Sequence, residues 1–433
     1  MEVQILSRKL IAPSSPTPPH LQNLKVSCFD QVAPSIYLPC IFYYPADGDQ
    51  NNEKRSKEME KSLAETLSLF YPLGGRYIKE EFSVECNDMG AEFLEAKVGG
   101  FLSQFLEREE REQSEMASHL VAPLFQPESG PLVMVQFNMF ECGGLAIGIS
   151  IAHRIADAFT IGTFISAWAT ACRIGSDKVH CRPSFQLCSL FPPKQMPPSS
   201  TGTAPGTDIK IIRRRFVFDG HTLSKLKAIA RGGDSEQLVK HHPSRVEVVT
   251  ALVWMALIRV AQARHGHLRP SLLGLTFNMR GKTAMTTPDY SCGNFVNSAN
   301  AQFMPDDEIK MELHHFVNRV HDAISTTTHD CAKASSSDDI YSTVSSKVRE
   351  VGEALGEDGV DTFIFSCWCR FPWYEADFGW GKPSWVSSVD VPSGIVMLMD
   401  TKDGDGIEVF LAMDESSMLA LQQNLDKTIS FTG

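Results

Sequence analysis

The sequence predicts a mixed α/β fold organised in two domains. Segments with the apolar period of a helix alternate with segments with the period of a strand along the whole chain. The 433 residues are too many for one ordinary hydrophobic core. One proline-rich segment, residues 191–210, interrupts the pattern and is typical of an exposed linker. We therefore expect an N-terminal domain at 1–190 and a C-terminal domain at 211–433.

The first half predicts two helices and a strand pair. Apolar residues at helical spacing, followed by a pair of glycines, indicate the first helix: Met59, Leu63, Leu67 and Phe70, then Gly74 and Gly75. Residues 132–140 and 145–152 are apolar runs joined by a glycine turn, which predicts a hairpin. A second amphipathic helix follows, with its apolar face at Ile161, Phe164, Ile165 and Trp168.

The second half begins with a strand of basic and apolar residues at 211–218. Residues 248–259 have a helical pattern, and residues 271–278 have that of a strand. Ser244 and Glu247 have the spacing of a capping box and mark the start of the helix.

Composition excludes several classes of protein. The net charge is −12 with no long run of like charge, which argues against a nucleic-acid partner. Eleven scattered cysteines without a CxxC pair indicate free thiols in the cytoplasm. No signal peptide and no stretch of about 20 apolar residues is visible, so we expect no membrane partner. A monomer is the default expectation.

His153 is the candidate general base. It follows the apolar strand at 145–152 and is the only one of the 13 histidines with an aspartate four residues later. A neutral imidazole has the pKa that suits proton abstraction near neutrality. The alternative is a packed histidine with a satisfied hydrogen bond, and these residues alone leave both open.

Asp157 invites a His-Asp dyad, but its position at a helix start favours another role. Its carboxylate could cap backbone amides or pair with an arginine. We expect Asp157 to point away from the substrates and to shape the site. Arg280, just after the strand at 271–278, is the expected partner.

Ser244 and Arg245 form a candidate anion site, because helix N-termini attract phosphates. The alternative is an ordinary helix start. Two other patterns fail. Gly281 and Lys282 resemble the end of a P-loop, but Thr276 stands where the first glycine of that loop is required. Ser150 lies in a continuous strand without the sharp turn of a nucleophile elbow. We find no metal-ligand spacing and no dinucleotide fingerprint.

A glycine-aromatic turn lies near the C-terminus, with Asp377, Gly379, Trp380 and Gly381. Glycines permit tight turns, and a buried tryptophan anchors a loop. None of these side chains is an obvious acid, base or nucleophile, so we expect a structural role.

Together, His153 with Asp157 and the 377–381 turn resemble the BAHD family of plant CoA-dependent acyltransferases, over essentially the whole chain. Similar blocks occur at 13–18, 70–76, 278–280, 293–294 and 366–370. The alkaloid-acetylating branch is most similar. Gly74 and Cys367 depart from the residues usual in the family, alanine and serine.

The resemblance implies two mixed-sheet domains of similar size with a channel between them. His153 would take the proton of an acceptor hydroxyl as it attacks an acyl-CoA thioester, without an acyl-enzyme. Acyl-CoA, most simply acetyl-CoA, would be a co-substrate, and no cofactor would be permanently bound. The implied CoA contacts are Ser244, Arg245, Ser291, Gly293 and Asn294. The acceptor would be an alkaloid or terpenoid alcohol; alternatives are an acylsugar or amine acceptor, or a hydrolase that uses water.

Overall fold

The computed structural model describes residues 1–48, 51–108, 110–123, 130–194, 210–232, 239, 241–305 and 311–430. The chain divides into two compact units. Unit 1 comprises residues 1–195, 287–295 and 371–390, and unit 2 comprises residues 196–286, 296–370 and 391–433. Most of the expected linker, residues 195–209, lies outside the described residues.

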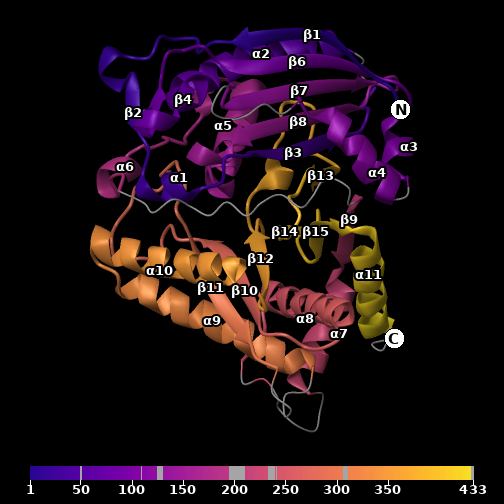
Figure 1. Ribbon diagram of the computed structural model, residues 1–433. Coiled ribbons are helices and arrows are strands. Elements are labelled where there is room, and N and C mark those ends of the chain that lie inside the picture. Colours follow the sequence, from indigo (N-terminus) through magenta and orange to yellow (C-terminus); the bar gives the residue numbers. More distant parts are fainter. Residues whose placement is uncertain are drawn as a thin grey trace. The chain divides into compact units, whose positions relative to one another are not determined.

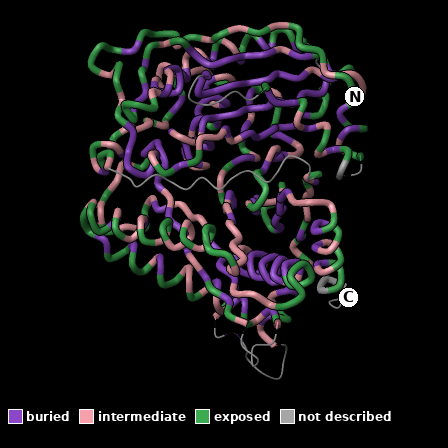
Figure 2. The backbone as a smooth tube through the Cα atoms, in the orientation of Figure 1, coloured by how far each residue is buried: buried purple, intermediate pink, exposed green. Residues whose placement is uncertain are grey.

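A six-stranded mixed sheet forms the centre of unit 1, in the order β1-β6-β7-β8-β3-β13 (Figure 1). Its strands are β1 (Val3–Ile11), β3 (Tyr37–Tyr44), β6 (Ala91–Val98), β7 (Val133–Phe140), β8 (Leu145–Ala152) and β13 (Trp385–Ser388). β7 and β8 pair antiparallel as the predicted hairpin, which is confirmed. Every residue of β8 is buried, and Figure 2 shows the same for most of its neighbours. The continuous apolar run at 145–152 is therefore a central strand.

Two long helices of unit 1 pack against each other, α2 (Asn52–Leu69) and α5 (Ala158–Ile174). Trp168 of α5 donates from its indole nitrogen to the backbone oxygen of Met59 of α2, at 3.2 Å. Both predicted helices of the first half are confirmed. α5 matters most for the site, because it begins directly after the His153 segment.

Shorter elements complete unit 1. A three-stranded sheet is formed by β2 (Asn23–Lys25), β5 (Ser83–Glu85) and β4 (Arg76–Ile78). The short helices are α1 (Cys28–Val32), α3 (Leu102–Leu106), α4 (Glu110–Ala117) and α6 (Leu187–Leu190).

Unit 2 has its own six-stranded mixed sheet, in the order β11-β10-β12-β14-β15-β9. The strands are β9 (Ile211–Phe218), β10 (Ser271–Asn278), β11 (Val296–Phe303), β12 (Asp361–Cys367), β14 (Ile395–Asp400) and β15 (Ile407–Asp414). β9 and β10 have the predicted limits. The mixed pairing arises because β10, β12 and β14 run parallel, whereas β11, β15 and β9 join antiparallel.

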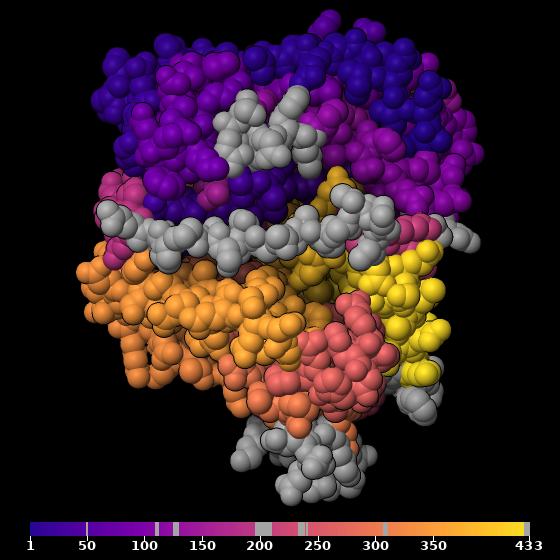
Figure 3. All heavy atoms as spheres, in the orientation of Figure 1, coloured from indigo at the N-terminus to yellow at the C-terminus, as the bar shows by residue number. Residues whose placement is uncertain are grey.

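The helices of unit 2 are α7 (Gly220–Arg231), α8 (Arg245–His265), α9 (Leu313–Lys333), α10 (Ser337–Gly356) and α11 (Glu415–Ser430). α10 packs on β10, β11 and β12, and its light-orange residues form part of the surface of unit 2 in Figure 3. α8 starts at the predicted capping box, which is confirmed. It is long and apolar enough to span a membrane by length and composition, so the expectation of no such stretch was wrong. Its burial in the core of unit 2 accounts for that composition.

The units do not follow the expected division of the chain throughout. Residues 287–295 and 371–390 come from the second half but pack in unit 1. One reason is β13, which pairs antiparallel with β3 at the edge of the unit 1 sheet. The 377–381 turn, expected in the C-terminal domain, accordingly belongs to unit 1.

Candidate active site

His153 lies where β8 ends, in a 3-10 turn at His153–Ile155. Its backbone nitrogen still donates to the backbone oxygen of Ile36, at 2.8 Å, which extends the β3–β8 pairing by one residue. The chain then turns, and α5 begins at Ala158. A rigid buried strand and a helix N-terminus therefore fix the backbone on either side of the imidazole.

The imidazole of His153 has its Nδ1 committed to a backbone carbonyl. Its Nδ1 lies 3.0 Å from the backbone oxygen of Ala156. A carbonyl oxygen can only accept, so Nδ1 carries the hydrogen and the Nε2 of a neutral ring keeps its lone pair. Burial lowers the pKa of His153 from its ordinary value of 6.5, against smaller opposing effects of the Ala156 carbonyl and Asp157. The ring is thus a neutral base at physiological pH.

Asp157 caps α5. Its Oδ1 accepts from the backbone nitrogen of Thr160 at 2.9 Å, and its Oδ2 accepts from the backbone nitrogen of Phe295 at 3.1 Å. The carboxylate is 2% exposed. The capping role is one of the two that the sequence left open, and this carboxylate also holds the 287–295 segment to the start of α5.

Replacing Asp157 by alanine should lower the melting temperature and the activity together. The change removes a helix cap, which costs about 1 kcal/mol, and leaves the buried Phe295 amide without its acceptor, which costs about 1–3 kcal/mol. Thermal unfolding and turnover of Asp157→Ala test this, with Asp157→Asn as the variant that keeps one acceptor oxygen. Lost activity with an unchanged melting temperature would contradict a structural role.

Asn294 links the same segment to His153. Its side-chain nitrogen donates to the backbone oxygen of His153 at 2.7 Å and to Oδ1 of Asp30 at 2.9 Å. Both partners are acceptors, so the orientation of the amide is determined by its contacts. The side-chain oxygen is buried and has no hydrogen-bond partner among the residues that the structure describes. The Asn294 side chain also acts on the imidazole of His153 and raises its pKa, against the larger effect of burial.

Asp30 is a site residue that the sequence analysis missed. Its carboxylate accepts from the backbone and side chain of Asn294, at 2.6 and 2.9 Å, and from the backbone and hydroxyl of Ser27, at 2.8 and 2.7 Å. Burial raises the pKa of Asp30 above its ordinary value of 3.8, against smaller opposing effects of these donors. Four donors around a carboxylate favour its ionised form. The spacing of Ser27 and Asp30 is a capping-box signal, but it does not reveal the contact with Asn294.

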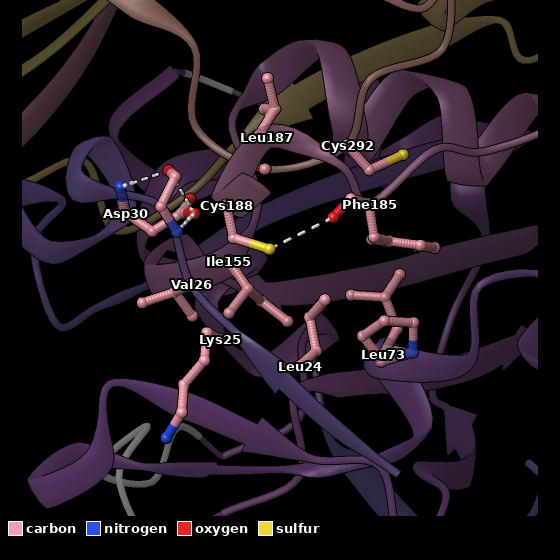
Figure 4. A pocket seen from close by; sticks show the side chains of 13 residues that line it. Leu24, Lys25, Val26, Asp30, Leu73, Ile155, Phe185, Leu187, Cys188 and Cys292 are labelled. Carbon is pink, nitrogen blue, oxygen red and sulfur yellow. Dashed lines mark hydrogen bonds between the residues drawn. The ribbon is translucent and has the colours of Figure 1, made fainter. Parts of the chain in front are cut away.

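A small cavity lies beside this network (Figure 4). Asp30, Ile155, Gly293 and Cys292 are among the residues that line it, and its volume is about 20 Å³. That volume suits one water molecule and is too small for a substrate. The cavity is therefore not a substrate site, and the hydrogen bonds of Asp30 and Asn294 hold the backbone of the His153 segment in place.

Ser291 and Gly293 also serve the local fold. The Ser291 hydroxyl donates to the backbone oxygen of Pro288 at 2.7 Å, and the Gly293 nitrogen donates to the Thr160 hydroxyl at 3.1 Å. Gly293 has a φ of 122°, which disfavours any side chain at this position. The structure thus brings Gly293 and Asn294 to the His153–Asp157 segment, and their contacts with CoA stay predictions.

The other predicted CoA contacts and the predicted partner of Asp157 lie in unit 2. Ser244 caps α8, and the Arg245 guanidinium contacts Asp400 at 3.0 Å and the backbone oxygen of Gly406 at 3.0 Å. Arg280 donates to the side chain of Asn278 at 3.0 Å. Phosphate binding at Ser244 and Arg245, and an Asp157–Arg280 pair, stay predictions.

The 377–381 turn packs at the other end of α5. Asp377 accepts from the backbone nitrogens of Gly379 and Gly381, at 2.9 and 3.0 Å, and pairs with Arg173 at 3.2 Å. Arg173 lies in the last turn of α5, 16 residues after Asp157. At 1.5 Å per residue the two ends are about 24 Å apart. This turn therefore supports α5 from a distance and does not reach His153.

A larger cavity belongs to unit 2 alone. Its volume is about 370 Å³, and it lies between the C-terminal part of α8 and the strands β12, β14 and β15. Leu257, Phe363 and Leu411 line it, with Arg264 and Asp414. None of the predicted site residues is among its lining.

Comparison with known proteins identifies the family. Residues 1–428 match the model of the Transferase family. The chain is 36% identical over 436 residues to acetyl-CoA-benzylalcohol acetyltransferase of Clarkia breweri, with 98% of each protein covered. This chain belongs to the BAHD acyltransferase family. It is an acyl-CoA-dependent acyltransferase, as the resemblance implied.

Other relatives agree with this assignment. The BAHD enzyme is 36% identical over 440 residues to stemmadenine O-acetyltransferase of Catharanthus roseus, covering 97% of this chain and 96% of that protein. Its structure matches that of vinorine synthase with a TM-score of 0.79 and 29% identity over 98% of each chain. The predicted fold class, two mixed-sheet α/β domains, is confirmed.

Proposed function

We propose that this BAHD enzyme transfers an acetyl group from acetyl-CoA to a hydroxyl of a plant specialised metabolite, an alkaloid or terpenoid alcohol, with His153 as general base. One observation carries the role of His153. The bond between its Nδ1 and the Ala156 carbonyl assigns the hydrogen to Nδ1, which leaves Nε2 as the basic nitrogen. The ring is fixed by the backbone on both sides, and burial keeps it neutral.

The proposed reaction needs no covalent enzyme intermediate. His153 Nε2 removes the hydroxyl proton as the acceptor oxygen attacks the thioester carbonyl carbon. The tetrahedral oxyanion collapses, the carbon–sulfur bond breaks, and the protonated imidazole returns the proton to the CoA thiolate. Stabilisation of that oxyanion should contribute strongly to the rate. The Ser150 hydroxyl, the nearest serine before His153 in the chain, lies within the all-buried strand β8, which agrees with direct transfer.

Relatives support acetyl-CoA as donor and an alcohol as acceptor. Two of them, the benzyl alcohol and stemmadenine enzymes, are named as acetyltransferases, and one is named for acetyl-CoA. The proposed contact of Asn294 with CoA rests on the family resemblance. A monomer in the cytoplasm is part of the proposal.

The pH profile tests the assigned base. Because burial lowers the pKa of His153 below 6.5, the inactive imidazolium forms only in acid. We expect kcat/KM to fall as the pH drops, with a midpoint below pH 6.5, and to be level above it. Initial rates with acetyl-CoA across the pH range give the profile. A midpoint above the ordinary histidine value would contradict a buried base.

An acceptor series tests transfer against hydrolysis, the second candidate. The expected result is that loss of the acetyl-CoA thioester depends on an added alcohol, with benzyl alcohol and alkaloid, terpenoid and sugar alcohols compared. Thioester absorbance is the better measure, because thiol reagents would also react with cysteines of the protein that are partly exposed. Thioester loss at the same rate without acceptor would indicate a hydrolase. Preference for sugar alcohols would overturn the proposed acceptor class.

A further inference from the structure

Three side chains of unit 2 form a cluster that the acyl transfer does not use. His241 lies just before α8, Glu247 is in the first turn of α8, and His321 lies on α9 (Figure 1). One ligand atom of each lies within 4.8 Å of the other two. α8 and α9 pack against each other, so two of the three positions are on rigid elements.

One ring nitrogen of each histidine lies close to the same carboxylate oxygen of Glu247. His321 Nδ1 lies 2.7 Å from Glu247 Oε1, and His241 Nε2 lies 3.9 Å from the same oxygen. The two imidazole rings are stacked, with centroids 3.5 Å apart. His241 Nε2 is buried and has no hydrogen-bond partner among the described residues. A buried nitrogen without a partner costs free energy that a bound ligand would recover.

Glu247 is already held in the orientation that a ligand needs. Its other oxygen, Oε2, accepts from the backbone nitrogen of Ser244 in the capping box. This bond fixes the carboxylate and leaves Oε1 for the two histidines. Asp322 and Arg231 are charged neighbours of His241 and have opposite effects on its pKa.

We propose that His241, Glu247 and His321 bind one divalent transition-metal ion, with zinc as the natural candidate. Two imidazoles and one carboxylate are a ligand set that zinc and cobalt accept, with water in the fourth position. Tetrahedral coordination places ligand atoms about 3.3 Å apart. The distance of 2.7 Å must therefore lengthen and that of 3.9 Å shorten, each by about 0.6 Å. His321 Nδ1 gives up any proton, and the stacked rings open so that their lone pairs face the ion.

The sequence predicted no metal site, because no residues have the spacing of metal ligands. Spacing could not reveal this site. His241 and Glu247 are six residues apart, but His321 is 74 residues beyond Glu247. The packing of α9 on α8 brings His321 close to Glu247. The ion would join the start of α8 to α9 and would stabilise unit 2.

Cobalt titration of the full-length, metal-free, reduced protein tests the proposal. We expect one Co²⁺ per chain, with the weak visible bands of nitrogen and oxygen ligands and without the strong near-ultraviolet band of thiolate ligands. His241→Ala and His321→Asn should each weaken binding at least about 100-fold, because loss of an outer-shell partner alone costs about 10–100-fold. Added Zn²⁺ should raise the melting temperature of the wild type and not that of the two variants.

A second histidine cluster provides the control. His314 and His315 lie near Glu312, which is exposed, and their replacement by alanine should leave Co²⁺ binding unchanged. Three results would overturn the proposal: no Co²⁺ binding by the wild type, equal binding by His241→Ala and His321→Asn, or a thiolate band that assigns the ion to cysteines. The metal-free variants should melt close to the metal-free wild type, which separates lost binding from lost folding.

Discussion

His153→Ala should lower kcat by about 10²–10⁴-fold, the usual contribution of a positioned general base. Without the imidazole, the acceptor hydroxyl must lose its proton to water while it attacks the thioester. The variant also loses the bond to the Ala156 carbonyl, which costs about 1 kcal/mol of stability. Turnover with saturating acetyl-CoA and a thermal unfolding curve measure the two effects separately.

His153→Asn separates chemistry from structure at this position. Its amide nitrogen can still donate to the Ala156 carbonyl, but it cannot act as a base. We expect His153→Asn to have the melting temperature of the wild type and a kcat as low as that of His153→Ala. His329→Ala, which removes an exposed histidine of α9, is the matched control and should keep full activity. Undiminished turnover of His153→Asn would reject His153 as the base.

Asp30→Ala should destabilise the protein more than any other single change considered above, by at least about 3 kcal/mol. Four buried or partly buried donors lose their acceptor, and each unsatisfied donor costs about 1–3 kcal/mol, less whatever water recovers. The Asn294 amide would then lose one of the two contacts that hold it against the His153 carbonyl. Urea unfolding of the variant measures the free energy of unfolding.

Asp30→Asn tests the positioning role in protein that folds. One amide oxygen still accepts, so the variant should be more stable than Asp30→Ala. If Asp30 positions His153 through Asn294, the fall in kcat of Asp30→Asn exceeds the rise in its KM for acetyl-CoA. Asp358→Ala, at an exposed aspartate, is the control. A wild-type melting curve for Asp30→Ala, or a wild-type kcat for Asp30→Asn, would contradict this role.

Local patterns predicted the elements on either side of the base. The apolar run at 145–152 is β8, and the apolar positions from Ile161 to Trp168 lie on α5. Asp157 was expected at a helix start, where it is the N-cap. These features depend on residues close in the chain, so periodicity and capping rules suffice to predict them.

The support of the site could not be predicted in this way. Asp30 and Asn294 are 264 residues apart, and no local pattern pairs them. The same holds for the transfer of residues 371–390 to unit 1, which depends on the pairing of β13 with β3. Side-chain hydrogen bonds between distant segments depend on where the sheets place them, and the sequence does not state that placement.

By itself the sequence predicted a two-domain α/β fold with an imidazole after a buried strand, because strand period and helix caps are local properties. Its two short motifs carried the resemblance to the BAHD family, which implied an acyltransferase. Only the tertiary structure decided which nitrogen of that imidazole is the base, which buried carboxylate holds its backbone, and which histidines meet in unit 2. The first follows from a hydrogen bond between residues three apart in the chain, at the turn after β8. The carboxylate and the histidine cluster depend on atoms brought within about 3 to 4 Å by long-range packing, a distance range in which hydrogen bonds and ligand contacts form.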